Sequence, residues 1–371
     1  MEQLKTGIRF AAEALIVSML ILSVIPASAD ESEANSGISV TDGYGTLFNF
    51  ADEPAHVATI GKGVTATVIQ LGGINKIVVA DSYSKTDTNS VFDPLRSQIS
   101  AGKTAAGGNI YSSGSTQLKT DIVDAADNGR FDKDKDPVFI TGGNSYISPI
   151  VEDLRSKGFK KVMAWNDITE YDSIPVFVGT ISRILSGTEA PVVEQMRNVP
   201  DTIEAGLSGH PLRDAFYVTY SGSAFKVGNI NSLANSMIIA AGGNSITTDD
   251  SKAKPTYEAN LTALIDDHPD AVIFLDTSIS GNADRLNALK IAVGETAYNN
   301  AVPLESLWNN YSVESMNGVW IMACAMYPDL FTGDVPSVDK SQPNNVPAYL
   351  SVSCIAALAI CIGGTMFLRK Q

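Results

Sequence analysis

Residues 56–80 read HVATIGKGVTATVIQLGGINKIVVA. A short β-branched run at 56–60 is followed by a glycine-bounded turn, an apolar helical pattern at 64–71 and a second β-branched run at 76–80. This order of strand, turn, helix and strand is typical of a parallel sheet covered by helices. We expect further strands of the same kind at 138–141, 162–165, 215–220 and 271–275. The sequence therefore predicts an α/β fold.

A helical region divides these strands into two groups. Residues 174–207 have helical patterns with little strand character, and Pro175 stands at the start, where proline is well tolerated. We predict an N-terminal α/β lobe at 38–173, a long helical connector at 174–207 and a C-terminal α/β lobe at 208–332. A polar stretch at about 85–136, rich in Gly, Ser, Thr and Asp, is interpreted as an insertion in the N-terminal lobe.

Both ends of the sequence have membrane-related patterns. Residues 1–29 have a basic start, an apolar run and a small-residue cleavage pattern, which predict a secretory signal peptide followed by a disordered linker at 30–37. An uncleaved anchor is the alternative, although the apolar run is shorter than the ~20 residues that a membrane span needs.

The pattern at the other end predicts a membrane anchor. Residues 349–368 are apolar and uncharged and are followed by Arg369 and Lys370, which favours a transmembrane helix with the lobes outside the cell. A proline-containing segment at 333–348 is interpreted as a stalk. The alternative is a cleaved lipid-anchor signal, which the basic end disfavours. We therefore expect the protein at the cell surface, anchored in the cell membrane.

Composition excludes several classes of function. The net charge is −15, and without a basic stretch we expect no nucleic-acid partner. Cys324 is the one cysteine outside the predicted membrane helix, so we expect neither an intrachain disulfide in the lobes nor a thiolate metal cluster. The three histidines have no ligand spacing, and no metal site is predicted. The alternating aspartates at 132–136 resemble a calcium loop without its sixth-position glycine, so a solvated turn is favoured.

Several segments, in this order and spacing, resemble the iron-siderophore, haem and cobalamin class of substrate-binding proteins that serve ABC importers. The segments lie at 38–45, 56–73, 181–189, 231–244, 267–273, 302–308 and 318–331. The resemblance covers about 38–331 and implies a periplasmic-binding-protein-like fold with a helical backbone. In that fold one rigid helix joins two lobes and a cleft between them holds the ligand. The polar stretch at 85–136 departs from the family pattern.

The implied ligand contacts are at the strand ends, where loops line the cleft of such a fold. Lys62 and the glycines beside it precede a helix and can hold an anionic group. The alternative is that the glycines serve only a tight turn. The two tryptophans among the candidates either stack on the ligand or pack in the core. The residues that we expect to contact the ligand are Gly61, Lys62, Gly63, Ser82, Tyr83, Trp165, Asn166, Tyr220, Ser221, Phe225 and Trp308.

The expected function is capture of a metal chelate outside the cell and its delivery to an ABC transporter permease. Aromatic side chains on both walls suit a bulky chelate, such as a ferric siderophore, haem or a corrinoid, better than a bare metal ion. We expect no cofactor and no catalysis, because the glycine-rich turns at 142–145 and 242–245 lack a nucleophile or phosphate-loop pattern. The alternative is a surface adhesion or scaffold protein with the same fold, and a chelate-modifying enzyme is a third hypothesis.

Overall fold

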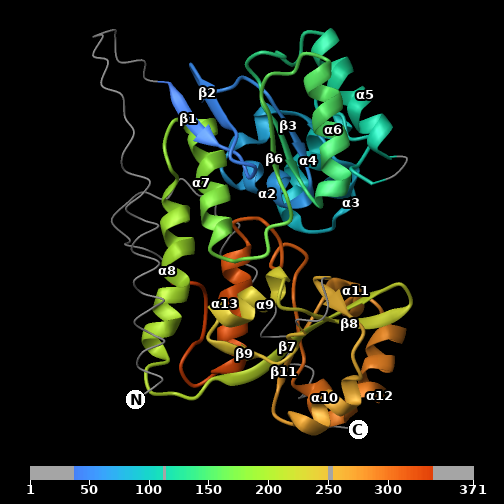
Figure 1. Ribbon diagram of the computed structural model, residues 1–371, viewed down its shortest axis with the longest axis vertical. Helices are drawn as coiled ribbons and strands as arrows, with labels where there is room; N and C mark the ends of the chain where they lie inside the picture. The colour runs from blue at the N-terminus through green and yellow to red at the C-terminus, as the bar shows by residue number, and fades with distance from the viewer. Residues whose placement is uncertain (1–36, 112–113, 250–253, 337–371) are drawn as a thin grey trace, which may run out of the picture. The chain divides into compact units, whose positions relative to one another are not determined.

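The computed structural model describes residues 37–111, 114–249 and 254–336, and Figure 1 shows their arrangement. The predicted signal peptide at 1–29 and transmembrane helix at 349–368 lie outside the described residues, as do nearly all of the predicted linker at 30–37 and most of the predicted stalk. Among the described residues, none of the helices combines the length and the apolar character that a membrane crossing requires.

The N-terminal lobe is built on a parallel sheet with strand order β4-β3-β5-β6. The strands are β3 (Val57–Ile60), β4 (Ile77–Ala80), β5 (Val138–Thr141) and β6 (Val162–Trp165). Every residue of these strands is buried, because helices and loops cover both faces of the sheet. The strands predicted from the β-branched runs are therefore confirmed, to within a residue at each end.

Helices and a hairpin surround this sheet (Figure 1). The helices are α2 (Lys62–Gln70), η1 (Gly73–Lys76), α3 (Ser82–Thr86), η2 (Ser90–Phe92), α4 (Asp93–Ser100), α5 (Gly114–Asp127) and α6 (Asn144–Ser156). The hairpin pairs β1 (Ile38–Thr41) with β2 (Leu47–Phe50). Its Gly43 amide donates to the carbonyl of Ala164 at 3.0 Å, which fastens the turn to the end of β6.

The polar stretch at 85–136 folds as part of this lobe. It contains α4 and α5, whose residues Leu95, Leu118 and Ile122 are buried in the core. Between the helices, Ala105 pairs with Val79 in a parallel bridge beside β4. The stretch therefore extends the alternation of strand and helix, although its surface positions are too polar for a periodicity argument to detect this.

The connector consists of two helices that pack side by side, α7 (Ser173–Ser186) and α8 (Pro191–Gly206). Gly187 ends α7 in the left-handed conformation with a φ of 73°, and Pro191 begins α8. The resemblance implies one rigid helix between the lobes. In Figure 1 it is α8 that runs from one lobe to the other, whereas α7 packs against the hairpin and α2 of the N-terminal lobe.

The C-terminal lobe has a mixed sheet in the order β10-β8-β7-β11-β12, with β9 also paired to β7. Its strands are β7 (Arg213–Ser221), β8 (Ala224–Gly228), β9 (Gly243–Ser245), β10 (Thr256–Tyr257), β11 (Val272–Leu275) and β12 (Val302–Pro303). Its helices are α9 (Leu233–Ala240), α10 (Leu261–Asp267), α11 (Thr277–Ser280), α12 (Ala283–Asn299) and α13 (Ser315–Met326). Strands β7 and β11 are parallel, as the sequence predicts, whereas β8 returns antiparallel to β7.

One hydrophobic cluster runs through both lobes and the connector. It includes Phe139 from the N-terminal lobe, Phe177 and Met196 from the connector and Phe274 from the C-terminal lobe. Helix α13 is buried along most of its length and contacts both α8 and α9. A shared core of this kind resists large movements between the lobes, because opening it would expose apolar surface to water.

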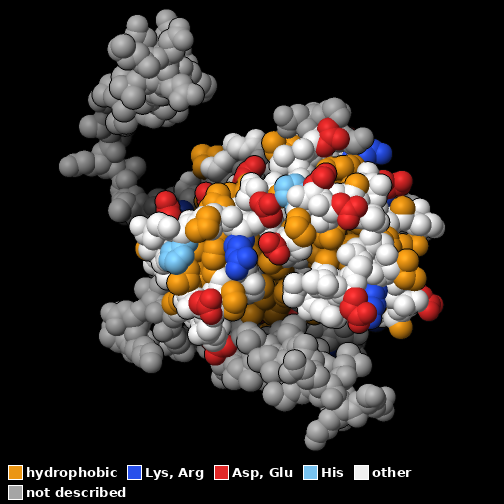
Figure 2. Space-filling view, turned by 90° about the horizontal axis from the view of Figure 1, so that it is seen from below, with side chains coloured by type: hydrophobic (Ala, Val, Ile, Leu, Met, Phe, Trp, Pro, Cys, Tyr) orange, Lys and Arg blue, Asp and Glu red, His pale blue; other side chains and the backbone are white. Residues whose placement is uncertain are grey.

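The surface reflects the acidic composition. Figure 2 shows acidic side chains scattered among apolar and neutral ones over the face seen from below, with few basic side chains between them. This distribution agrees with the net charge of −15 for the whole sequence.

Candidate ligand cleft

A cleft of about 830 Å³ lies between the two lobes. Loops after β3, β4, β5 and β6 form its N-terminal wall, so the carboxyl ends of the parallel strands face the cleft. The C-terminal wall comes from β7, from the start of α9 and from the loop that precedes α13. Its position agrees with the rule that open α/β sheets bind ligands at the carboxyl ends of their strands.

Asp81 is a buried residue whose carboxylate accepts hydrogen bonds from two loops of the N-terminal wall. Its Oδ1 accepts hydrogen bonds from the amides of Tyr83 at 2.8 Å and Ser84 at 3.0 Å, which caps α3. Its Oδ2 accepts from the amide of Gly61 at 2.9 Å and from the hydroxyl of Ser84 at 2.7 Å. Burial raises the pKa of Asp81 above its ordinary value, and the four donors only partly oppose this effect. One carboxylate therefore joins the loops after β3 and β4.

Replacing Asp81 with asparagine tests this arrangement. Asparagine keeps an acceptor for the amides of Tyr83 and Ser84, but its Nδ2 is a donor and cannot bind the Gly61 amide. Because the pKa of Asp81 is raised in the folded chain, ionisation above about pH 4 costs the folded state stability, and asparagine does not ionise. We expect the stability of Asp81→Asn relative to wild type to rise between about pH 4 and pH 7, measured by urea unfolding.

Asp81→Ala provides the comparison, because alanine also removes the cap of α3 and should be less stable than Asp81→Asn by about 1 kcal/mol. A relative stability of Asp81→Asn that stays flat or falls over this pH range would contradict the assignment.

Gly61 occupies a position that only glycine fits. Its φ is 114°, and a Cβ at this residue would lie 2.2 Å from the Oγ1 of Thr141. The loop after β3 can therefore approach the end of β5 closely, and both Gly61 and Thr141 line the cleft.

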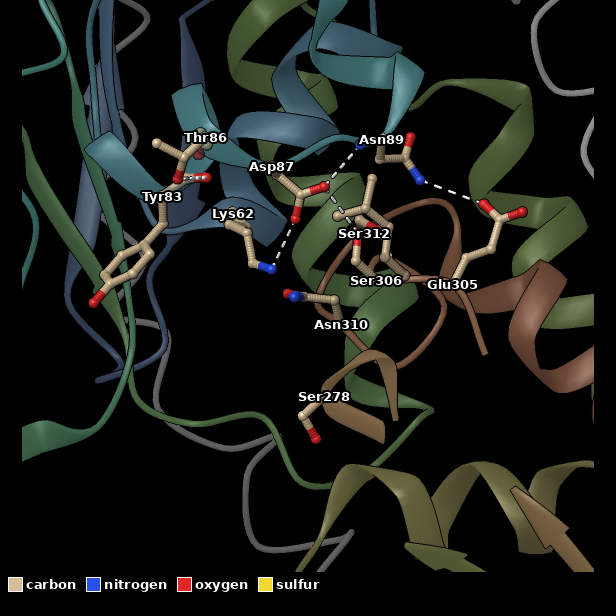
Figure 3. Close-up of polar contacts among 12 residues, drawn as sticks. Lys62, Tyr83, Thr86, Asp87, Asn89, Ser278, Glu305, Ser306, Asn310 and Ser312 are labelled. Carbon is tan, nitrogen blue, oxygen red and sulfur yellow. Dashed lines mark hydrogen bonds and ion pairs between the residues drawn. The ribbon is translucent and has the colours of Figure 1, made fainter. Parts of the chain in front are cut away.

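Lys62 lines the cleft, and its ammonium already has a partner within the protein. Its Nζ donates to Oδ2 of Asp87 at 2.9 Å, and the Asp87 Oδ1 accepts from the hydroxyl of Ser306 at 3.0 Å (Figure 3). Asn89 also donates to Asp87 through its amide and to Glu305 through its side chain. Burial tends to raise the pKa of Asp87, but the bonds from Lys62, Asn89 and Ser306 outweigh it and lower the pKa. The network ties the N-terminal lobe to the segment after β12.

Tyrosines form the aromatic part of the cleft. The ring centroids of Tyr83 and Tyr111 are 5.7 Å apart and those of Tyr111 and Tyr146 are 4.8 Å apart, both edge to face. Each of these three side chains is nearly half exposed, with values of 46%, 42% and 47%. Tyr311 lines the cleft from the other lobe, and its hydroxyl donates to Oδ1 of Asp167 at 3.3 Å.

Five of the predicted ligand-contacting residues lie in the wall of the cleft. They are Gly61, Lys62, Gly63, Tyr83 and Asn166. The ammonium of Lys62, one of the groups expected to hold an anion, is already paired with Asp87. Ligand contact by these residues stays a prediction.

The predicted tryptophans are core residues. Trp165 is 6% exposed and packs against Phe139 and Phe177, with ring centroids 6.3 Å and 5.0 Å away. Trp308 has no exposed surface. In both cases the alternative of core packing is the one that the structure supports, because the side chains turn into the cluster shared by the lobes.

The other predicted residues also lie outside the cleft wall. Tyr220 and Phe225 face each other across the β7–β8 hairpin at 5.3 Å, and the guanidinium of Arg285 covers the Tyr220 ring. Ser221 stands at the end of β7 in the same hairpin. The hydroxyl of Ser82 accepts from the side chain of Asn109 at 3.3 Å. Tyr220 and Phe225 are partly buried against the core of the C-terminal lobe, where β8 folds back antiparallel to β7 instead of continuing to a loop at the cleft.

Most of the lining residues were not predicted, among them Asp81, Asp167, Tyr111 and Tyr311. Asp81 directly follows β4 and Asp167 directly follows the predicted Asn166. Their positions at strand ends could therefore have been used to predict them as cleft residues. Tyr111 and Tyr311 lie in long irregular segments, where no periodicity marks them.

Two of the histidines, His56 and His268, and the aspartate run make hydrogen bonds at strand entries. Nδ1 of His56 lies 3.3 Å from Oδ2 of Asp136, and that oxygen also accepts from the Asp132 amide at 2.8 Å. Nδ1 of His268 lies 2.8 Å from Oδ2 of Asp214. Among the described residues, no three side chains of the His, Cys, Asp and Glu types gather as a metal site would need.

Comparison with known proteins identifies the class of fold. No family model and no curated protein sequence matches this chain. Solved structures do match it. CeuE of Helicobacter pylori in a nickel–histidine complex has a TM-score of 0.56 at 12% identity, over 79% of this chain and 89% of CeuE.

Two further solved structures match this chain with similar TM-scores and sequence identities. The periplasmic vitamin B12 binding protein BtuF of Vibrio cholerae has a TM-score of 0.53 at 14% identity, over 74% of this chain and 97% of BtuF. A periplasmic haem binding protein of Pseudomonas aeruginosa has a TM-score of 0.52 at 18% identity, over 75% of this chain and 94% of that protein. The fold is that of the periplasmic binding proteins, and the resemblance inferred from the sequence is confirmed at this level.

Proposed function

We propose that this protein is an extracellular solute-binding protein that captures a metal chelate and delivers it to an ABC importer. The observation that carries this proposal is the open cleft of about 830 Å³, which both lobes line and which lies at the carboxyl ends of the N-terminal strands. Its volume falls in the range of about 300–1,000 Å³ that small-molecule sites occupy.

The chemistry of the cleft favours a chelate over a bare ion. Tyr83, Tyr111 and Tyr311 offer aromatic surface, while Asn166 and Asn310 add neutral hydrogen-bonding groups. Within the described ranges no cluster of metal-ligating side chains stands in the cleft, so a metal would arrive with its own ligands. The solved structures of this fold include proteins described as binding nickel–histidine, vitamin B12 and haem.

The cleft also disfavours the two alternative functions, an adhesion or scaffold protein and a chelate-modifying enzyme. A surface adhesion or scaffold protein has no need of an open cleft, and a filled one would be its expected feature. A chelate-modifying enzyme would need a group of free titratable side chains at the floor. Here Asp81 is saturated by four donors and Lys62 is held by Asp87. We therefore favour a binding protein without catalysis.

The location outside the cell is also part of the proposal. It is supported by the signal-peptide pattern at 1–29 and by the apolar segment at 349–368 with its basic end. In this arrangement the lobes would stand at the outer face of the membrane and present a loaded cleft to the permease.

Thermal unfolding with a panel of compounds tests the proposal. The full chain in detergent would be heated with ferric siderophores, haem, cobalamin and free metal ions. A ligand at a hundred times its dissociation constant adds about 2.7 kcal/mol to the stability of the folded state, which should raise the midpoint by about 5 °C. We expect a shift with a chelate and none with bare ions. A folded protein that responds to no chelate would contradict the proposed function.

A further inference from the structure

Asp167 is an exposed carboxylate in the cleft wall without a basic partner. It directly follows Asn166 at the end of β6, and both side chains are exposed and line the cleft. Its hydrogen bond is with the hydroxyl of Tyr311 at 3.3 Å, and among the described residues no Lys, Arg or His forms an ion pair with it. A charge in this position remains available to a ligand.

The other charged groups of the cleft do not offset Asp167. Lys62 is the one basic residue among the described lining residues, and Asp87 neutralises it at 2.9 Å. Asp81 is buried beneath the wall and saturated by four donors. The surface that a ligand meets in the cleft therefore has an excess of negative charge around Asp167, which disfavours an anionic ligand.

Two tyrosine rings lie near this carboxylate. Tyr311 contacts it directly, and Tyr111 lies near enough that, after burial, the Asp167 charge is the next largest cause that raises the pKa of the Tyr111 phenol. Tyr111 stands in a row between Tyr83 and Tyr146, and all three rings are nearly half exposed. The faces of such rings attract organic cations. A carboxylate beside tyrosine rings is an arrangement suited to an ammonium or guanidinium group.

We propose that Asp167, together with Tyr111 and Tyr311, binds a positively charged group of the ligand, so that the chelate carried by this protein has a cationic substituent. This inference rests on the proposed function and narrows it to one ligand class. A chelate with a free amine, such as a linear ferric trihydroxamate that ends in a primary ammonium, fits the class. A trianionic ferric tris-catecholate and haem with its two propionates do not.

A matched pair of ligands tests the inference by isothermal titration of the full chain in detergent. One ligand is a linear ferric trihydroxamate with a free ammonium, and the other is the same chelate with that amine acetylated. We expect the wild type to bind the ammonium form about tenfold more tightly, because a charge-assisted hydrogen bond is lost on acetylation. Asp167→Asn should remove this difference and leave the affinity for the acetylated form within about twofold.

Asp201→Asn is the matched control. Asp201 is an exposed residue of α8 outside the cleft wall, so the same change in net charge there should leave both affinities as in the wild type. Asp167 is exposed, and asparagine retains an acceptor for the Tyr311 hydroxyl, so Asp167→Asn is expected to fold normally.

The outcomes separate the inference from the function on which it rests. Equal binding of the two trihydroxamates by the wild type would overturn the inference, and so would a difference that Asp167→Asn preserves. Tighter binding of the tris-catecholate, of haem or of any chelate without a cationic group would also overturn it, while the proposed chelate-binding function would stand. If no chelate binds at all, the proposed function fails and the inference fails with it.

Discussion

Trp308→Ala is expected to lower the free energy of unfolding by about 3–5 kcal/mol, the usual cost of emptying a large buried aromatic site. Trp308 has no exposed surface and belongs to the cluster that joins the two lobes. It packs closely against α13, since a Cβ placed at Gly318 would lie 2.7 Å from the Trp308 carbonyl oxygen and 3.0 Å from its Cβ. Urea unfolding of the full chain in detergent measures the loss.

Trp308→Phe separates a packing role from a ligand role. Phenylalanine keeps most of the apolar volume, so we expect a smaller loss of stability and unchanged chelate binding. If Trp308 stacked on the ligand instead, Trp308→Ala would weaken binding while leaving the unfolding free energy within about 0.5 kcal/mol of wild type, which is the usual range for a surface position.

Gly63→Ala is expected to disturb both stability and binding. Gly63 is the second residue of α2, and a Cβ there would lie 2.6 Å from Oδ1 of Asn310 and 2.7 Å from the carbonyl oxygen of Tyr311. The backbone of that segment must move, at a typical overpacking cost of about 1–3 kcal/mol that opposes the gain of about 1 kcal/mol in helix propensity. Because Asn310 and Tyr311 line the cleft, we expect chelate affinity to fall about tenfold, measured by titration of the purified variant.

Gly72→Ala is the control for this prediction. A Cβ at Gly72 meets no atom within 4 Å, although its φ of 82° makes alanine unfavourable. We expect Gly72→Ala to cost about 1 kcal/mol of stability and to leave chelate affinity unchanged. Equal affinity losses in the two variants would show that the close approach at Gly63 has no part in shaping the cleft.

Local sequence patterns predicted the secondary structure well where one face or both faces of an element are buried. The runs at 57–60, 77–80, 138–141 and 162–165 are β-branched and apolar because strands of a parallel sheet are covered on both faces. The break between α7 and α8 at Gly187 and Pro191 was not predicted, although glycine suits the left-handed end of a helix and proline its first turn. These signals act over a few residues and are visible in the sequence.

The same reasoning predicted only part of the cleft wall. Strand ends correctly located Gly61, Lys62 and Asn166, because parallel strands bring their carboxyl ends to one edge. The location of a strand end does not predict whether a side chain there points into the cleft or into the core. Trp165 stands beside Asn166 yet turns into the core, since Phe139 and Phe177 leave room for it there.

Local sequence patterns predict the α/β alternation, the helical connector and the strand ends that form the N-terminal wall, because each depends on periodicity or on the backbone preferences of Gly and Pro. Which aromatic side chains line the cleft, and which charges there remain available, depends on the tertiary packing. Tyr311 meets Asp167 across 144 positions of sequence, and Asp87 neutralises Lys62 across 25. Contacts between such distant residues arise from tertiary packing, so no local pattern records them.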